Sequence, residues 1–173
     1  MRIHLGCGTK RLPGFVHVDA RAEVRPDYVA DALNLSCLSD DEVGLLYFCH
    51  GLEHIGFGAV GDALAEWGRV LKPGGELRLS MPDFGAIARA YNDGVSLRLV
   101  RYALMGGQGY AENFHYSTWD FDTLKVALEM AGYTDVALYD ARAWLPDGYS
   151  DWSVGKIAGY DISLNVRATW KLA

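Results

Sequence analysis

Two glycines and two aspartates in the N-terminal third of the chain stand where short apolar stretches end. Gly6 and Gly8 follow residues 2–5, while Asp19 and Asp31 close the next two stretches. Closely spaced glycines after a strand let the backbone approach a ligand without an intervening Cβ atom. A carboxylate at each of the next two strand tips can accept from ribose hydroxyls and from an adenine amine. The spacing therefore predicts an adenosine-shaped site at the carboxyl ends of a parallel sheet.

The glycine pattern differs from that of dinucleotide-binding loops. The G-x-G-x-x-G fingerprint needs a third glycine where Arg11 stands, and no helical stretch follows to receive a pyrophosphate. The sequence also has no Walker lysine motif. We therefore expect an adenosine ligand without a phosphate chain rather than NAD. A tight turn without a ligand is the alternative for the two glycines.

Strands alternate with helices along the 173 residues, which we expect to form a single domain, 1–173. Predicted strands cover residues 2–5, 16–18, 28–30, 43–49, 76–81, 133–139 and 161–170. Predicted helices cover residues 59–71, 84–91, 95–104 and 121–131, with Asp83 and Asp120 as N-caps of the second and fourth. The alternation predicts an α/β fold with a mostly parallel sheet.

The connections between the first three predicted strands are short. Residues 6–15 and 20–27 are too few for the dozen or so residues that a parallel crossover usually needs, so helices are reduced there. One face of the sheet near these strands is then thinly covered. We expect a second subunit to cover it, which predicts a homodimer.

Composition and charge narrow the class of protein. Asp plus Glu number 22 against 16 Lys plus Arg, a formal charge of −6, which disfavours a nucleic-acid partner. The sequence contains no run of about 18 apolar residues, so we expect no membrane-spanning helix. The first residues also lack the pattern of a signal peptide. Cys7, Cys37 and Cys49 form no C-x-x-C pair, which favours reduced thiols and a cytoplasmic location without membrane contact.

Several runs of the sequence resemble class I S-adenosylmethionine-dependent methyltransferases of the subgroup called type 11. The runs are Leu5-Gly6-Cys7-Gly8, Val18-Asp19, Asp31-Ala32-Leu33, His50-Gly51-Leu52-Glu53-His54 and Arg69-Val70-Leu71-Lys72-Pro73-Gly74-Gly75. The resemblance is specific from Arg2 to about Phe84 and weaker as far as Asn165. It implies S-adenosyl-L-methionine as the cofactor. It also implies a Rossmann-like, mostly parallel seven-stranded sheet with an antiparallel last strand.

The resemblance also implies the cofactor-binding residues, which lie at the ends of four strands. They are Gly6, Cys7 and Gly8 at the methionine and ribose, Asp19 at the ribose hydroxyls, Asp31 and Ala32 at the adenine, and His50 at the methionine end. The chain departs from the family pattern where His4 replaces an acid and Lys10 replaces a glycine. We expect His4 and His17 to be strand residues with satisfied polar atoms rather than catalysts.

His115 and His54 are the candidate catalytic residues. His115 lies in a polar and aromatic loop, residues 108–119, where it could accept the proton of an acceptor hydroxyl or amine. A loop histidine bonded to backbone is the alternative. His50, Glu53, His54 and His115 resemble a mixed nitrogen and oxygen metal site. Since the L-E-H run is common in type 11 sequences without a metal, we expect none.

The expected function is transfer of a methyl group from S-adenosylmethionine to a small-molecule or sugar-containing acceptor. One alternative is a non-catalytic module that binds S-adenosylmethionine or S-adenosylhomocysteine and acts through a protein partner. Another is a nucleic-acid methyltransferase, which the acidic composition disfavours. Four aromatic residues before the last strand either stack on the acceptor or fill the end of the sheet: Trp144, Tyr149, Trp152 and Tyr160.

Overall fold

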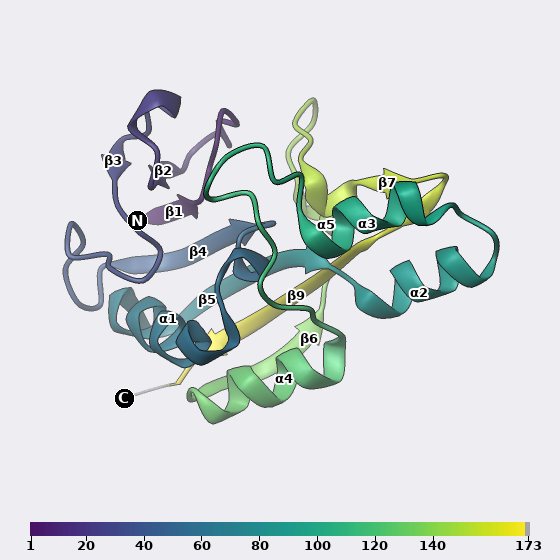
Figure 1. The fold of residues 1–173 in the computed structure, drawn as a ribbon. Helices are drawn as coiled ribbons and strands as arrows, with labels where there is room; N and C mark the ends of the chain where they lie inside the picture. The colour runs from purple at the N-terminus through teal and green to yellow at the C-terminus, as the bar shows by residue number, and fades with distance from the viewer. Residues whose placement is uncertain (172–173) are drawn as a thin grey trace.

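A seven-stranded sheet forms the centre of the protein in the computed structural model, which describes residues 1–171 (Figure 1). The strands of this sheet are β1 (Arg2–Leu5), β2 (Val16–Asp19), β3 (Tyr28–Val29), β4 (Val43–Cys49), β5 (Leu71–Pro82), β6 (Tyr133–Leu138) and β9 (Ser163–Trp170). Two further strands, β7 (Lys156–Ile157) and β8 (Tyr160–Asp161), form a separate two-stranded ribbon. The helices are α1 (Phe57–Val70), α2 (Phe84–Asn92), α3 (Leu97–Met105), α4 (Phe121–Met130) and α5 (Ala141–Trp144). Single 3₁₀ turns are η1 (Ala22–Val24), η2 (Leu52–His54) and η3 (Trp152–Val154).

The order of the strands is β3-β2-β1-β4-β5-β9-β6. Strands β1 to β5 pair in parallel, and β9 runs antiparallel to both of its neighbours, β5 and β6. The predicted α/β fold with a mostly parallel sheet and an antiparallel last strand is thereby confirmed. Because β1, β2, β3 and β4 are parallel, their carboxyl ends meet at one edge.

One face of the sheet is covered by α1 and α4, which lie on the same side in Figure 1. Helix α1 buries a stripe at helical spacing, and its Trp67 packs edge-on against Phe48 of β4. Helix α4 begins in a capping box between Asp120 and Thr123, and Asp83 caps α2. Both predicted N-caps are therefore confirmed.

The opposite face is covered differently from our expectation. Residues 6–15 contain no helix and residues 20–27 contain only η1, as predicted. Even so, Tyr47 of β4 is fully buried on this face. Side chains of the same chain pack around it: Leu12, Phe15, Trp144, Leu145 and Tyr149. Because the chain fills this face itself, no second subunit is needed to cover Tyr47, and the homodimer stays a prediction.

Three local expectations are corrected. Strand β9 begins at Ser163, since residues 160–161 leave the sheet and pair with β7 in a separate ribbon. Strand β5 begins at Leu71, which pairs with Val43 ahead of a register shift. We expected the polar atoms of His4 and His17 to be satisfied. Both residues are buried, yet His4 Nδ1 and His17 Nε2 have no hydrogen-bond partner within residues 1–171.

No helix within residues 1–171 has the length and apolar character needed to cross a membrane.

Candidate functional site

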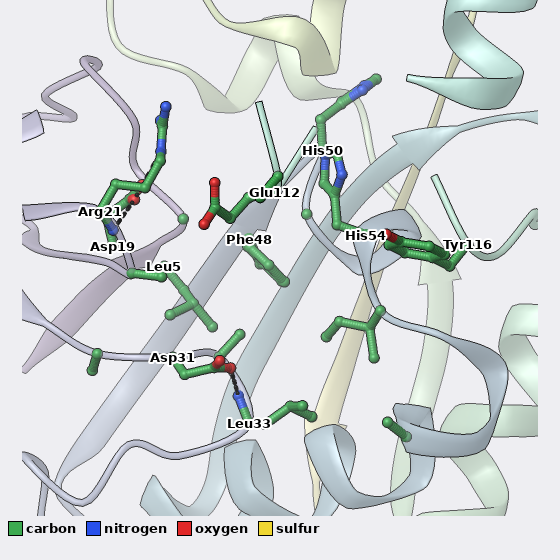
Figure 2. Close-up of a pocket in the computed structure, with 18 of the residues that line it drawn as sticks. Leu5, Asp19, Arg21, Asp31, Leu33, Phe48, His50, His54, Glu112 and Tyr116 are labelled. Carbon is green, nitrogen blue, oxygen red and sulfur yellow. Dashed lines mark hydrogen bonds and ion pairs between the residues drawn. The ribbon is translucent and has the colours of Figure 1, made fainter. Parts of the chain in front are cut away.

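A cavity of about 470 Å³ opens at the carboxyl ends of β1, β2, β3 and β4 (Figure 2). Five of the predicted cofactor-binding residues line this cavity, and they come from segments far apart in the chain. These are Gly6, Asp19, Asp31, Ala32 and His50. Its apolar lining includes Leu5, Ala30, Leu33, Phe48, Ile55 and Ala59. The cavity therefore combines an apolar wall with a few convergent polar groups, as ligand sites commonly do.

The backbone passes very close to the Phe48 ring at two glycines. Gly6 has φ +58°, and a Cβ atom on it would lie 2.4 Å from Phe48 Cε2. A Cβ atom on Gly51, just after β4, would lie 1.9 Å from the same carbon. Only glycine fits at either place, so the tips of β1 and β4 and the ring of Phe48 form one packed wall.

Asp19 is held by two backbone donors at the tip of β2. The N–H of Gly8 donates to Oδ2 at 2.7 Å, and the N–H of Arg21 donates to Oδ1 at 2.9 Å. The carboxylate is nearly buried and borders the cavity. Oδ1 also lies 3.5 Å from Nε of Arg21, whereas Oδ2 keeps a lone pair with which it can accept from a ligand hydroxyl.

Asp31 and Ala32 lie at the far end of the cavity, after β3. The N–H of Leu33 donates to Asp31 Oδ1 at 2.8 Å, which fixes the carboxylate in a local turn. The carbonyl of Ala32 accepts from the indole Nε1 of Trp67 at 2.8 Å. This leaves the second oxygen of Asp31 and the N–H of Ala32 for a ligand, a pair that suits the edge of an adenine ring.

Cys7 and Gly8 are not among the described residues that line the cavity. The Cys7 thiol points into the protein, where burial raises its pKa to about 11, and its Sγ lies 3.5 Å from Arg11 Nη1. The Arg11 guanidinium donates to the carbonyls of Gly8, Val24 and Arg25, so it joins the loop after β1 to the segment after β2. Gly8 contributes to the site through its bond to Asp19, and the contact of Cys7 with a ligand stays a prediction.

His50 occupies the end of β4 with a left-handed backbone, φ +50°. Its Nε2 lies 2.8 Å from Ser163 Oγ, and that hydroxyl donates to the carbonyl of Trp152 at 2.6 Å. Because the serine proton is directed at Trp152, the Nε2 of His50 must be the donor of the pair. An uncommon backbone conformation held by such a network is typical of functional sites.

A segment that sequence reasoning did not assign lies against the same cavity. Tyr110, Ala111 and Glu112 line it, and the Arg21 guanidinium lies 4.7 Å from the centre of the Tyr110 ring. In Figure 2, Glu112 lies between Arg21 and His50. The aromatic character of residues 108–119 was visible in the sequence, but nothing there indicated a contact with Arg21.

A second cavity, of about 660 Å³, adjoins the first. The two share His50, His54 and Tyr110. Exposed rings and polar groups line the second cavity: Tyr102, Trp152, Asn113 and Lys156. Of the four aromatics noted in the sequence, Trp152 lies here, Trp144 and Tyr149 fill the sheet face, and Tyr160 packs beside α2 and α3.

Glu53, His54 and His115 gather at the wall of the second cavity. His54 Nδ1 lies 3.0 Å from the carbonyl of Phe114, and His115 Nδ1 lies 2.9 Å from that of Ala103. Burial of the ring lowers the pKa of His115. Burial alone would raise the pKa of Glu53, but the contact with His50 and the charges of His50 and His54 outweigh it and lower that pKa. Both predicted catalytic histidines therefore face the same cavity.

Comparisons with known proteins bear on the family and the fold. Residues 4–79 match the family described as methyltransferase domain. An S-adenosylmethionine-dependent methyltransferase of Methanosarcina mazei superposes with a TM-score of 0.65 at 15% identity, covering 99% of this chain and 92% of its own. A second such enzyme, from Archaeoglobus fulgidus, superposes with a TM-score of 0.59 at 16% identity and covers 96% of this chain and 84% of its own. A third, from Thermotoga maritima, superposes with a TM-score of 0.61 at 20% identity and covers 98% of this chain and 81% of its own. Among curated proteins, none matches the chain significantly.

Proposed function

Because residues 4–79 carry a methyltransferase domain of the type 11 group and the whole chain has the class I methyltransferase fold, we propose that the protein is an S-adenosylmethionine-dependent methyltransferase. S-adenosylmethionine is its cofactor. We further propose that the acceptor is a small molecule or a sugar-containing compound. The cytoplasm is the proposed location, which three unpaired cysteines support.

The placement of Asp19 and Asp31 around one cavity is the observation that carries the proposal. Asp19 borders the cavity beside Gly6, where the ribose hydroxyls of the cofactor would be accepted. Asp31 and the N–H of Ala32 lie where the adenine would be held, against the apolar side chains of Leu33 and Ala59. The methionine part would then extend toward His50, where the first cavity meets the second.

The reaction needs alignment more than chemical activation from the protein. A lone pair of the acceptor attacks the methyl carbon, and the carbon–sulfur bond breaks with its electron pair on sulfur, giving S-adenosylhomocysteine. The acceptor atom gives up its proton in the same overall reaction, to His115 as the proposed general base. Since the sulfonium is already reactive, holding the acceptor in line with the methyl group supplies most of the catalysis. His54 and His115 line the second cavity, where the acceptor would bind. They are therefore the proposed catalytic residues.

The lining of the second cavity favours an acceptor with a ring or a sugar face. Trp152 and Tyr102 expose flat apolar surfaces there, and Asn113 and Lys156 supply hydrogen-bond donors. Aromatic rings beside a few polar groups are typical of sites for small organic ligands. The acidic composition supports a small acceptor over a nucleic acid.

Calorimetric titration with S-adenosylhomocysteine tests the cofactor site, with NAD as the control ligand. We expect saturable binding of the first compound alone. Turnover is then tested with a panel of acceptors that starts with nucleotide sugars, and S-adenosylhomocysteine release is measured. Absence of cofactor binding would contradict the proposal. Cofactor binding without turnover of any acceptor would favour the non-catalytic module instead.

A further inference from the structure

The carboxylate of Glu53 is buried without the partners that a buried anion needs. Its side chain is 1% exposed, and neither oxygen has a hydrogen-bond partner within residues 1–171. His50 Nδ1 lies 3.3 Å from Oε1, and His115 Nε2 lies 3.9 Å from the same oxygen. Burying a carboxylate without donors is costly, so this arrangement requires a cation or a shared proton close to Glu53.

The neighbouring histidines present lone pairs rather than donors. A carbonyl oxygen can only accept, so His54 Nδ1 and His115 Nδ1 must each carry the proton that they give to Phe114 and Ala103. In the neutral rings the Nε2 atoms are therefore acceptors. The rings pack edge to face with their centres 4.8 Å apart. Among Glu53, His54 and His115, two imidazole lone pairs and one carboxylate thus meet without a donor, and the closest candidate donor outside these three residues is His50 Nδ1, 3.3 Å from Oε1.

We propose that Glu53, His54 and His115 bind one divalent transition-metal ion. Each offers a ligand atom, and the three atoms lie within 4.8 Å of one another. Imidazole nitrogen with carboxylate oxygen suits Zn²⁺ or Fe²⁺, whereas Mg²⁺ prefers oxygen ligands alone. The bonds from Nδ1 to backbone carbonyls are the outer contacts that orient metal-binding histidines. This proposal departs from our expectation of no metal, which rested on sequence frequency alone.

The ion would have a direct role in the proposed methyl transfer, and this part of the inference rests on the proposed function. Three protein ligands leave coordination positions open, as in catalytic zinc sites. His54 and His115 both line the second cavity, so an open position would face the acceptor. The acceptor would then be a compound that presents a hydroxyl or carboxylate oxygen to the ion. The histidines would act on the acceptor through the metal rather than by taking its proton themselves.

Metal binding can be measured on the whole chain without any activity assay. Protein stripped with a chelator and dialysed is titrated calorimetrically with Zn²⁺, and with Mg²⁺ as the control ion. Co²⁺ is added in parallel, because its visible absorption reports the coordination geometry. The variants are His54→Gln, His115→Gln and Glu53→Gln. His17→Gln is the matched control, since His17 lies on β2 away from the cluster and pairs with Asp27.

We expect one Zn²⁺ per chain, no saturable Mg²⁺ binding, and a Co²⁺ spectrum of low coordination number. Loss of either histidine should weaken Zn²⁺ binding at least about 100-fold, beyond the ~10–100-fold effect of losing an outer contact. The His17→Gln variant should bind as the unchanged protein does. If Glu53→Gln does not fold, as circular dichroism would reveal, the two histidine variants still decide the matter.

The metal site would be overturned if the unchanged protein bound no Zn²⁺, or if the His54→Gln and His115→Gln variants bound Zn²⁺ as tightly as the unchanged protein does. A titration of the stripped protein with S-adenosylhomocysteine separates this failure from failure of the proposed function. Cofactor binding without metal binding would refute the metal site and leave the methyltransferase proposal standing. Metal binding without cofactor binding would support the metal site and contradict the methyltransferase proposal.

Discussion

The backbone N–H of Gly8 donates a hydrogen bond of 2.7 Å to Oδ2 of Asp19, which joins the loop after β1 to the tip of β2. The second glycine of the loop thus orients the carboxylate that faces the cavity. The family resemblance implied that both glycines line the ligand, but only Gly6 borders the cavity. The two glycines therefore have different roles, one in the wall and one in positioning Asp19.

Replacing Asp19 with alanine should weaken S-adenosylhomocysteine binding about 10- to 100-fold, since a hydrogen bond to a charged group contributes about 1.5–3 kcal/mol. The N–H groups of Gly8 and Arg21 also lose their acceptor, so modest loss of stability is expected. Calorimetry measures the affinity, and Asp122→Ala on the exposed side of α4 is the control. Unchanged affinity in Asp19→Ala would show that the ribose assignment is wrong.

Replacing Gly6 with alanine should lower both the melting temperature and the cofactor affinity. Its left-handed backbone alone costs an L-residue about 1–2 kcal/mol, and the new Cβ would lie 2.4 Å from the Phe48 ring. The matched control is Gly61→Ala in α1, where a Cβ atom meets nothing within 4 Å and alanine favours the helix by roughly 1 kcal/mol. Equal melting temperatures for the two variants would contradict the close packing of Gly6 on Phe48.

Replacing Tyr110 with alanine should weaken cofactor binding several-fold. The ring holds the segment beside the first cavity through Arg21, and a cation–π contact contributes about 0.5–2 kcal/mol. Tyr110→Phe keeps a ring and should bind nearly as the unchanged protein does. Tyr91→Ala, at an exposed position of α2, controls for loss of a surface tyrosine. The role of this contact would be refuted by equal affinities for the alanine and phenylalanine variants.

His4 should make the protein less stable as the pH falls from about 6.5 to about 4. Burial lowers its pKa to about 4, helped by the charges of His17 and Arg11 and opposed by Asp151 and Asp19. Between these values the unfolded chain binds a proton that the folded protein does not. The free energy of unfolding therefore decreases as the pH decreases. A shift from 6.5 to about 4 corresponds to roughly 3 kcal/mol.

Urea unfolding at several pH values, compared with the His4→Leu variant, measures this effect. The variant lacks the titrating group and should lose less stability over the same interval. Parallel loss in both proteins would assign the pH dependence to other residues.

The sequence by itself determined the elements and the edge of the sheet at which the first cavity opens. Apolar runs predicted the first four strands to within a residue, three of them ending at glycine or aspartate, and Asp83 and Asp120 marked two helix starts. These signals are local, because side-chain periodicity and capping depend on neighbours along the chain. Since parallel strands end at one edge, placing Asp19 and Asp31 on one cavity needed no further information.

Only the tertiary structure decided which of these residues line the cavity and what surrounds them. It turned Cys7 inward, packed Phe48 between Gly6 and Gly51, and covered the open sheet face with Trp144. It also brought His115 to Glu53 across a long stretch of chain. No local pattern encodes such contacts, because they depend on how helices and loops pack after the sheet has formed. For the same reason the buried, unpartnered carboxylate of Glu53 is visible only in the folded protein.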